Sequence, residues 1–333
     1  MPQVLVGFAA FMMDTETASP PWDATLDAAS VLRNFSPEAA DEVRALLGAH
    51  PAFNGMTDPQ TLESVALDPE VLPTFMEDIR AMREEAWGGN NFVVIQPVEG
   101  LSLEQQMAVP WLIGQVLGHT LVQNQQGHRY YIITDRGGRI EEGARYSQTS
   151  QGGSFHTDGV NQKDNYEFMV LHCAVAAAEG GDSILLDGRM VYDDLRENAP
   201  PELEVLQQDF LWEYKGVRPG EFYHEPILRL VEGNPQWRYL RDYIEEVARL
   251  CGEPLSAEAV AALDRLDESL ANPAFQFRFK LDAGQTAVVR DRSVFHGRNP
   301  FRDAPGTVSI EERLAAGLDA PLKRTYCRIW VNP

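Results

Sequence analysis

Cysteine is scarce in this sequence. The 333 residues contain three cysteines, Cys173, Cys251 and Cys327, and they lie far apart. An odd number of distant cysteines gives neither a disulfide framework nor the paired spacing of a zinc knuckle. We therefore expect a protein that folds without disulfides, in the reducing environment of the cytoplasm.

Long hydrophobic runs are missing as well. The hydrophobic stretch near the start, from Val4 to Met13, is too short to span a bilayer, and no basic residue precedes it. We interpret it as an N-terminal strand. The composition is 44% hydrophobic, which is enough for a globular chain with a substantial buried core.

Basic residues are few compared with acidic ones. Lys and Arg total 28 against 50 Asp and Glu, which gives a formal net charge of −22. A surface of this sign repels nucleic acid and anionic membranes, so neither is expected as a partner. The sequence also lacks a Gly-rich phosphate loop, a nucleophile elbow and a dinucleotide fingerprint. A small molecule is the expected partner, and the oligomeric state is not set by the sequence.

The patterns that are present indicate a mainly helical part, residues 1–90, followed by a strand-rich part, residues 91–333. Ser36-Pro37 and Asp58-Pro59 are typical of helix starts, and Ser102 to Gln105 has a capping-box pattern. Extended runs predict strands at 92–95, 130–134, 155–158, 168–173, 183–186, 274–281, 286–290 and 324–331, with a helical insert at about 237–270. We expect a single α+β domain, residues 1–333, built on an antiparallel sandwich.

One pair of residues has the spacing of metal ligands. His156 and Asp158 lie two residues apart on a predicted strand, where alternate side chains share a face, so both can reach one metal ion. A chain with this many carboxylates contains such a pair by chance, so the pair alone does not establish a site. His296 follows a later extended run and by itself is equally typical of a core or loop histidine. Together the three residues make the facial triad of non-haem Fe(II) sites, which leaves three coordination positions open.

Two arginines lie on the last predicted strand. Arg324 and Arg328 share one strand face with Tyr326 and Trp330. Arginine on an otherwise apolar face costs free energy unless it is paired. A dicarboxylate cosubstrate is one such partner, because guanidinium binds carboxylate in a bidentate fork. A network of surface ion pairs is the alternative.

Four short motifs follow one another along the chain: His156-Thr-Asp158, the turn Gly180 to Ser183, the segment Arg290 to Gly297, and the pair Arg324 and Arg328. In this order they resemble the taurine dioxygenase-like (TauD/TfdA) family, over roughly residues 90–333. The resemblance implies a double-stranded β-helix, or jelly-roll, core with flanking and inserted helices. It also implies an Fe(II)- and 2-oxoglutarate-dependent dioxygenase, an oxidoreductase that uses O2.

The resemblance also implies roles for single residues. Iron is expected at His156, Asp158 and His296, and 2-oxoglutarate at Ser183, where threonine is more usual, and at Arg324. Arg328 matches a position that contacts either the cosubstrate or the primary substrate. Because a carboxylate stands at residue 158, halogenation is not the expected chemistry.

The chain departs from the family in one segment. Residues 297–323 separate His296 from Arg324, a longer stretch than is usual, and Ile310 to Leu314 within it has the pattern of a short helix or lid. Arg313 in this segment competes for the cosubstrate role. We favour Arg324, because it lies in a strand pattern whereas Arg313 lies in a charged helical one.

The substrate is less constrained than the cofactors. Ser154, Gln151, Asn161 and Arg328 are polar residues close to the predicted metal ligands, and they suit a small polar or amino-acid-derived molecule. Hydroxylation of an unactivated C–H bond is the expected reaction, and the breadth of the family suggests a role in the biosynthesis of specialised natural products. Two other classes stay open: a zinc-dependent hydrolase on a cupin-like barrel, and a non-catalytic jelly-roll binding module.

Overall fold

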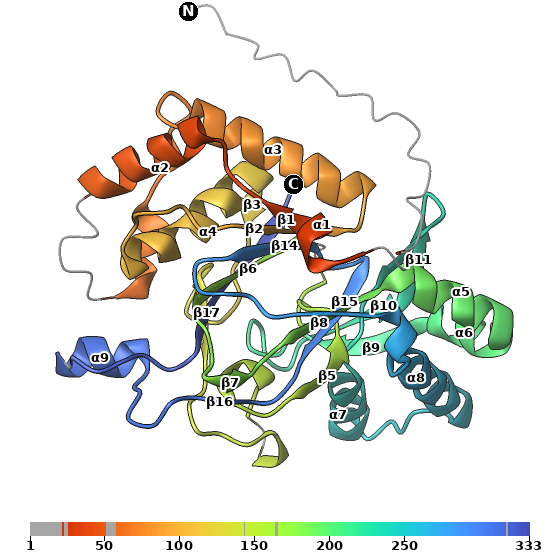
Figure 1. Ribbon diagram of the computed structural model, residues 1–333. Helices are drawn as coiled ribbons and strands as arrows, with labels where there is room; N and C mark the ends of the chain where they lie inside the picture. The colour runs from red at the N-terminus through yellow and green to blue at the C-terminus, as the bar shows by residue number, and fades with distance from the viewer. Residues whose placement is uncertain (1–21, 23–25, 51–57, 143, 164–165, 318) are drawn as a thin grey trace, which may run out of the picture.

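The computed structural model describes residues 22, 26–50, 58–142, 144–163, 166–317 and 319–333. The predicted strand from Val4 to Met13 lies outside these residues. The described chain contains both helices and sheets of mainly antiparallel strands, arranged in layers (Figure 1). The predicted α+β class is therefore confirmed.

Helices from the first third of the chain cover one face of the larger sheet (Figure 1). They are α2 (Pro37–Ala49), α3 (Pro73–Gly88) and α4 (Leu103–Leu117), preceded by the short α1 (Ala28–Val31). The predicted starts are confirmed for two of them, because the Ser36 side chain caps α2 and Ser102 forms a capping box with Gln105 at α4. Asp58 instead caps a 3₁₀ helix, η2 (Pro59–Ser64).

The larger sheet has seven strands in the order β1-β2-β14-β6-β17-β3, with β4 paired to β17. Their bounds are β1 (Leu32–Arg33), β2 (Phe92–Ile95), β3 (His119–Thr120), β4 (Tyr131–Thr134), β6 (Phe168–Val175), β14 (Thr286–Arg290) and β17 (Thr325–Asn332). Alternate residues of β17 face opposite ways. Cys327 and Ile329 pack toward the helices, whereas Tyr326 and Trp330 pack on the inner side. This parity also puts Arg328 on the inner side.

The smaller sheet has four strands in the order β13-β8-β15-β5. Their bounds are β5 (Gly153–His156), β8 (Ser183–Asp187), β13 (Gln276–Phe279) and β15 (Val294–Arg298). Leu185 and Val294 face the inner core that also holds Tyr326, whereas Leu186 and Phe295 face away from it. Because Val294 points inward, the same parity puts His296 and Arg298 on the inner face.

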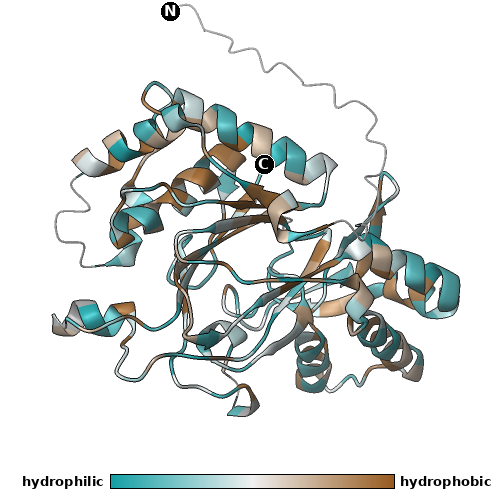
Figure 2. Cartoon of the chain, in the orientation of Figure 1, coloured by the Kyte–Doolittle hydropathy of each residue, from teal (hydrophilic) through white to brown (hydrophobic). Residues whose placement is uncertain are grey.

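The outer face of the smaller sheet is covered by helices and hairpins (Figure 1). The predicted insert is confirmed as α7 (Arg241–Cys251) and α8 (Ala257–Leu270). The sequence reading missed the preceding elements, which are α5 (Gly188–Asn198), α6 (Pro200–Leu206), the hairpin β9 (Asp209–Glu213) with β10 (Phe222–Pro226), and the hairpin β11 (Leu228–Val231) with β12 (Asn234–Trp237). Brown, hydrophobic ribbon in Figure 2 marks the faces that these layers bury.

The remaining short elements lie around the rim of the sheets. They are η3 (Ile140–Glu142), η4 (Tyr146–Gln148), β7 (Glu179–Gly180), η5 (Pro273–Phe275), β16 (Phe301–Arg302) and α9 (Ile310–Ala316). The last of these confirms the short helix predicted between His296 and Arg324. The three cysteines are free, as expected, and no helix of the described chain has the length and apolarity to cross a bilayer.

Candidate active site

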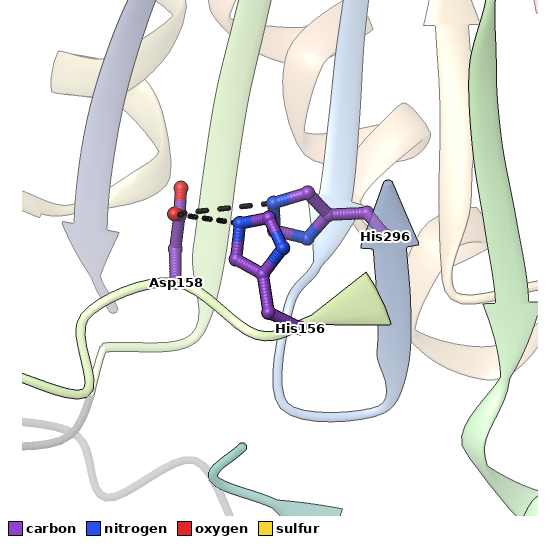
Figure 3. A group of neighbouring side chains, drawn as sticks. All are labelled: His156, Asp158 and His296. Atoms are coloured by element: carbon purple, nitrogen blue, oxygen red, sulfur yellow. Dashed lines mark ion pairs between the residues drawn. The ribbon is translucent and has the colours of Figure 1, made fainter. Parts of the chain in front are cut away.

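The predicted metal ligands lie together on the smaller sheet. His156 ends β5, and His296 is its direct partner on β15, so their ring centroids are 4.3 Å apart. The Nε2 atoms of His156 and His296 lie 3.8 Å and 3.9 Å from Oδ1 of Asp158 (Figure 3). One ligand atom from each residue lies within 4.8 Å of the other two. A strand was predicted to continue to Asp158, which is wrong: β5 ends at His156, and the turn after it carries the carboxylate back toward the histidines.

Both histidines are oriented by their other ring nitrogen. Nδ1 of His156 lies 2.9 Å from the carbonyl oxygen of Ser154, and Nδ1 of His296 lies 3.1 Å from Oδ1 of Asp291. An acceptor at Nδ1 places the proton there and leaves Nε2 with its lone pair toward Asp158. This is the tautomer that binds a metal ion.

Asp291 is a residue of the site that the sequence reading missed. It is fully buried, and its Oδ2 accepts hydrogen bonds from the Tyr166 hydroxyl and, at 2.8 Å, from the backbone N–H of Asp158. One carboxylate thus connects His296 to the backbone of Asp158. The only signal in the sequence was an aspartate five residues before His296, at the turn between two strands.

The protonation states of Asp158 and His156 suit metal binding. Burial opposes ionisation of Asp158, but Arg328 and the two histidines lower its pKa to about 2. Burial and the neighbouring His296 lower the pKa of His156 to about 4, so its ring is neutral at pH 7. Burial also disfavours protonation of His296, yet the Asp291 carboxylate raises its pKa overall.

Arg328 lies against the candidate ligand set. Its Nη1 is 2.9 Å from both carboxylate oxygens of Asp158, and its Nε donates to Gln123 at 2.9 Å. Trp330 adds a hydrogen bond of 3.1 Å from its indole nitrogen to Asp158. The carboxylate is therefore neutralised and held by two residues of one strand face.

A cavity of about 100 Å³ opens on one side of the three ligands. Ser183 and Arg324 line it, whereas Arg313 is not among the described lining residues. Arg324 is 4% exposed, and its Nη1 has no hydrogen-bond partner among the described residues. Its guanidinium lies over the ring of Tyr326, 3.6 Å from the centroid. A buried cation facing a cavity in this way needs an anion.

Arg298 is a second arginine of this cavity, and the sequence reading missed it. It follows His296 by two residues on β15 and therefore shares its face. Its Nη2 donates to the carbonyl oxygens of Thr149, at 3.0 Å, and Gln151. Burial and the nearby Arg324 lower its pKa to about 10. Two mostly buried cations thus lie beside one small cavity.

A larger pocket of about 620 Å³ lies next to this small cavity. The two pockets meet at His156, Asp158 and Arg328, which line both. Asn161 lines the larger one and donates to the carbonyl oxygen of Lys215 at 2.9 Å.

The other two predicted substrate residues make different contacts. Neither Ser154 nor Gln151 is among the described residues that line them. The Ser154 carbonyl orients His156, and the side chain of Gln151 accepts from the backbone N–H of Ile140 at 2.7 Å.

Comparison with known proteins gives related sequences. FR-33289 synthase of Streptomyces rubellomurinus is 28% identical over 62% of this chain and 61% of its own length. A uridine-5'-phosphate dioxygenase of Streptomyces sp. is 28% identical over 47% of this chain and 58% of its own. The chain therefore matches only about three fifths of these relatives.

Comparison with solved structures gives the same type of fold. Asparagine oxygenase in complex with Fe(II), 2S,3S-3-hydroxyasparagine and succinate superposes with a TM-score of 0.63 at 16% identity, covering 91% of this chain and 93% of that one. Residues 63–311 match the model of the taurine catabolism dioxygenase TauD, TfdA family. The match covers most of the chain, and the chain belongs to the TauD/TfdA family of dioxygenases.

Proposed function

We propose that this protein is an Fe(II)- and 2-oxoglutarate-dependent dioxygenase that hydroxylates a C–H bond of a small polar molecule. One observation carries the proposal: two histidines and a carboxylate converge beside a cavity lined by the buried Arg324, whose Nη1 has no hydrogen-bond partner among the described residues. Fe(II) with 2-oxoglutarate and O2 supplies an oxidant able to remove hydrogen from an unactivated carbon. The protein's residues position the reactants around it.

The donor set fits iron. Two neutral imidazole nitrogens and one carboxylate on one side of an ion leave positions open for a cosubstrate and O2. His156, Asp158 and His296 would hold the metal, with the rings fixed by Ser154 and Asp291. Arg328 would keep one carboxylate oxygen of Asp158 hydrogen-bonded. Its positive charge also keeps that carboxylate ionised.

The small cavity fits the dicarboxylate cosubstrate. We infer that Ser183 and Arg324 bind the carboxylate of 2-oxoglutarate that lies away from the metal. Ser183 supplies a hydroxyl at the cavity wall, and Arg324 supplies the unpartnered donor. Arg298 contributes a second positive charge, which the incoming anion would compensate.

The larger pocket suits the primary substrate. Arg328 and Asn161 supply polar groups close to the metal ligands, and Tyr131 adds a hydroxyl. A pocket of about 620 Å³ lies within the range usual for small-molecule sites. The names of the relatives, which include a nucleotide and an amino acid derivative, favour a small polar or amino-acid-derived substrate. We propose a role in specialised-metabolite biosynthesis.

We also propose that the two sheets form a double-stranded β-helix within one catalytic domain. Strands β4, β6, β14 and β17 lie in the larger sheet, and β5, β8, β13 and β15 lie in the smaller one. Along the chain, consecutive strands of this set lie in alternate sheets, except that β8 and β13 both lie in the smaller sheet. This alternation is the pattern that a jelly roll requires.

Anaerobic titration of the apo protein with Fe(II) and 2-oxoglutarate tests the proposal. The iron-bound cosubstrate has a weak visible absorption band, and we expect that band in the wild type. His156→Ala should abolish it, and Arg324→Ala should weaken it. A folded, iron-loaded wild type without the band would instead favour a zinc hydrolase or a binding module, and activity with Zn(II) in the absence of O2 would separate these two.

A further inference from the structure

We propose that the primary substrate carries an oxyanion, a carboxylate, sulfonate or phosphate group, at the end away from the metal, and that Arg145 and Arg249 bind this group in the larger pocket. The inference rests on the proposed function, because it concerns the substrate of the same site. It is carried by the charges that line the pocket.

Among the described residues, four cationic side chains line the larger pocket of a chain whose net charge is −22: Arg145, Lys215, Arg249 and Arg328. The carboxylates among the described lining residues are three: Asp158, Asp242 and Glu246. An acidic protein that gathers four cations around one pocket has a local charge opposite to that of its surface. Such a pocket attracts anions.

Two of these four cationic side chains pair with carboxylates of the pocket, and two do not. Arg328 is paired with Asp158 at 2.9 Å, and Lys215 is paired with Glu246. The third carboxylate, Asp242, accepts a hydrogen bond of 3.1 Å from the Tyr146 hydroxyl. Within the described part of the chain, neither Arg145 nor Arg249 has a carboxylate partner.

The two arginines come from different elements. Arg145 precedes η4. A Cβ atom added at Gly216 would lie 2.3 Å from Nη2 of Arg145, so the guanidinium of Arg145 lies against the backbone at Gly216. Arg249 lies in the last turn of α7, seven residues after Asp242 and three after Glu246, and all three line the pocket. Two guanidinium groups from separate elements can hold one oxyanion from two sides.

Negative charge is stabilised at Tyr131, one of the residues that line the pocket. Burial should raise the pKa of Tyr131, whose ring lines the pocket. Its pKa is nevertheless lowered, because the Ser147 hydroxyl and the charges of Arg328, Arg145 and Arg136 stabilise the phenolate. A bound oxyanion would experience the same field.

Sulfate binding to the full-length protein tests this inference. The protein is loaded anaerobically with Fe(II) and saturating 2-oxoglutarate, so that the cosubstrate cavity is filled, and is titrated calorimetrically with sodium sulfate at constant ionic strength. We expect Arg145→Gln and Arg249→Gln each to weaken sulfate binding about fivefold, and the double variant to weaken it more. Arg196→Gln removes an equal charge from an exposed position on α5 and should leave binding unchanged.

The visible band of bound 2-oxoglutarate, followed in the same samples, separates the two proposals. If the band forms and the double variant binds sulfate as the wild type does, the oxyanion inference is wrong and the proposed function stands. If the wild type forms no band, the proposed function itself fails. Tetramethylammonium chloride provides a cation probe. If the wild type binds tetramethylammonium and Asp242→Asn loses this binding, the inference is overturned in favour of a cationic substrate.

Discussion

The buried carboxylate of Asp291 connects His296 to the backbone of Asp158. Asp291→Asn keeps the size of this side chain and removes its charge. Without the charge, Nδ1 of His296 is no longer fixed as the protonated nitrogen, so Nε2 is a poorer ligand. We expect the affinity for Fe(II), measured by anaerobic calorimetry, to fall roughly 10- to 100-fold.

A matched control separates orientation of the ligand from loss of a buried charge. Asp187 is also fully buried and is far in sequence from the candidate metal ligands. It pairs with Arg189 and accepts a hydrogen bond of 2.9 Å from the backbone N–H of Trp22. Asp187→Asn should lower stability without changing Fe(II) affinity. Equal losses of affinity in both variants would show that Asp291 has only a structural role.

Arg298 gives a second prediction for a single residue. Its guanidinium is mostly buried near Arg324, and the positive charges of the two repel each other until an anion enters. We expect Arg298→Gln to raise the KM for 2-oxoglutarate roughly tenfold, equivalent to about 1.4 kcal/mol, and to leave Fe(II) affinity unchanged. Arg302→Gln is the control, since Arg302 lies on β16 with 75% of its side chain exposed. An unchanged KM in Arg298→Gln would mean that this charge does not act on the cosubstrate.

Among the elements, the glycine turn at the end of β7 lies against Arg324. Gly180 and Gly181 have φ angles of 67° and 77°, in the left-handed region that favours glycine. A Cβ at Gly180 would lie 2.3 Å from the carbonyl oxygen of Pro300, and one at Gly181 would lie 3.4 Å from Nε of Arg324. The turn thus brings the chain against β16 and Arg324, with no room for a Cβ at Gly180 and a tight fit for one at Gly181.

Alanine at Gly180 combines backbone strain with a clash. We expect Gly180→Ala to lower the free energy of unfolding by roughly 2–4 kcal/mol in urea denaturation. Gly127→Ala is matched in backbone angle, with φ of 81°, but a Cβ there meets nothing within 4 Å. That variant should lose only about 1 kcal/mol. If the two losses are equal, the contact with Pro300 is unimportant.

The elements predicted from sequence are those whose signals are local. Ser102 and Gln105 satisfy each other at the start of α4, and β14 is an apolar run between turns, so neighbouring residues suffice to indicate both. Helix α5 was missed because it follows β8 without a break. Asp187 ends the strand and also caps the helix, and few of the following residues are buried.

The residues of the candidate site also differ in whether local sequence patterns indicate them. His156, Asp158 and His296 were found because few residue types bind iron and because their order resembles a family. Asp291, Arg298 and Arg145 are ordinary turn, strand and loop residues. They become parts of a site only through contacts across the fold, which local patterns do not indicate.

On the scale of the whole molecule, two pockets of different size adjoin at the candidate metal ligands. The smaller cavity, of about 100 Å³, is lined by Arg298 and Arg324, and the larger, of about 620 Å³, by Arg145 and Arg249. Inner residues of both sheets supply the smaller one, whereas α7 and the loops at the rim supply much of the larger. We propose that the cosubstrate binds between the sheets and that the substrate binds beside α7.

Because ligands complete this interior, they should stabilise the whole fold. Nη1 of Arg324 has no hydrogen-bond partner among the described residues and would gain one from a bound anion, and Asp158 would gain a second cationic partner from a bound metal ion. A ligand at about 100 times its Kd adds about 2.7 kcal/mol to the free energy of unfolding, which corresponds to a rise in Tm of roughly 3–6 °C for a chain of this size.

We expect Fe(II) alone to raise the Tm under anaerobic conditions, and 2-oxoglutarate to raise it further only when Fe(II) is present. Arg324→Ala should keep the first rise and lose most of the second, whereas His156→Ala should lose both. A rise with 2-oxoglutarate that is equal in the wild type and in Arg324→Ala would place the cosubstrate elsewhere, and Arg313 would then be the next arginine to replace.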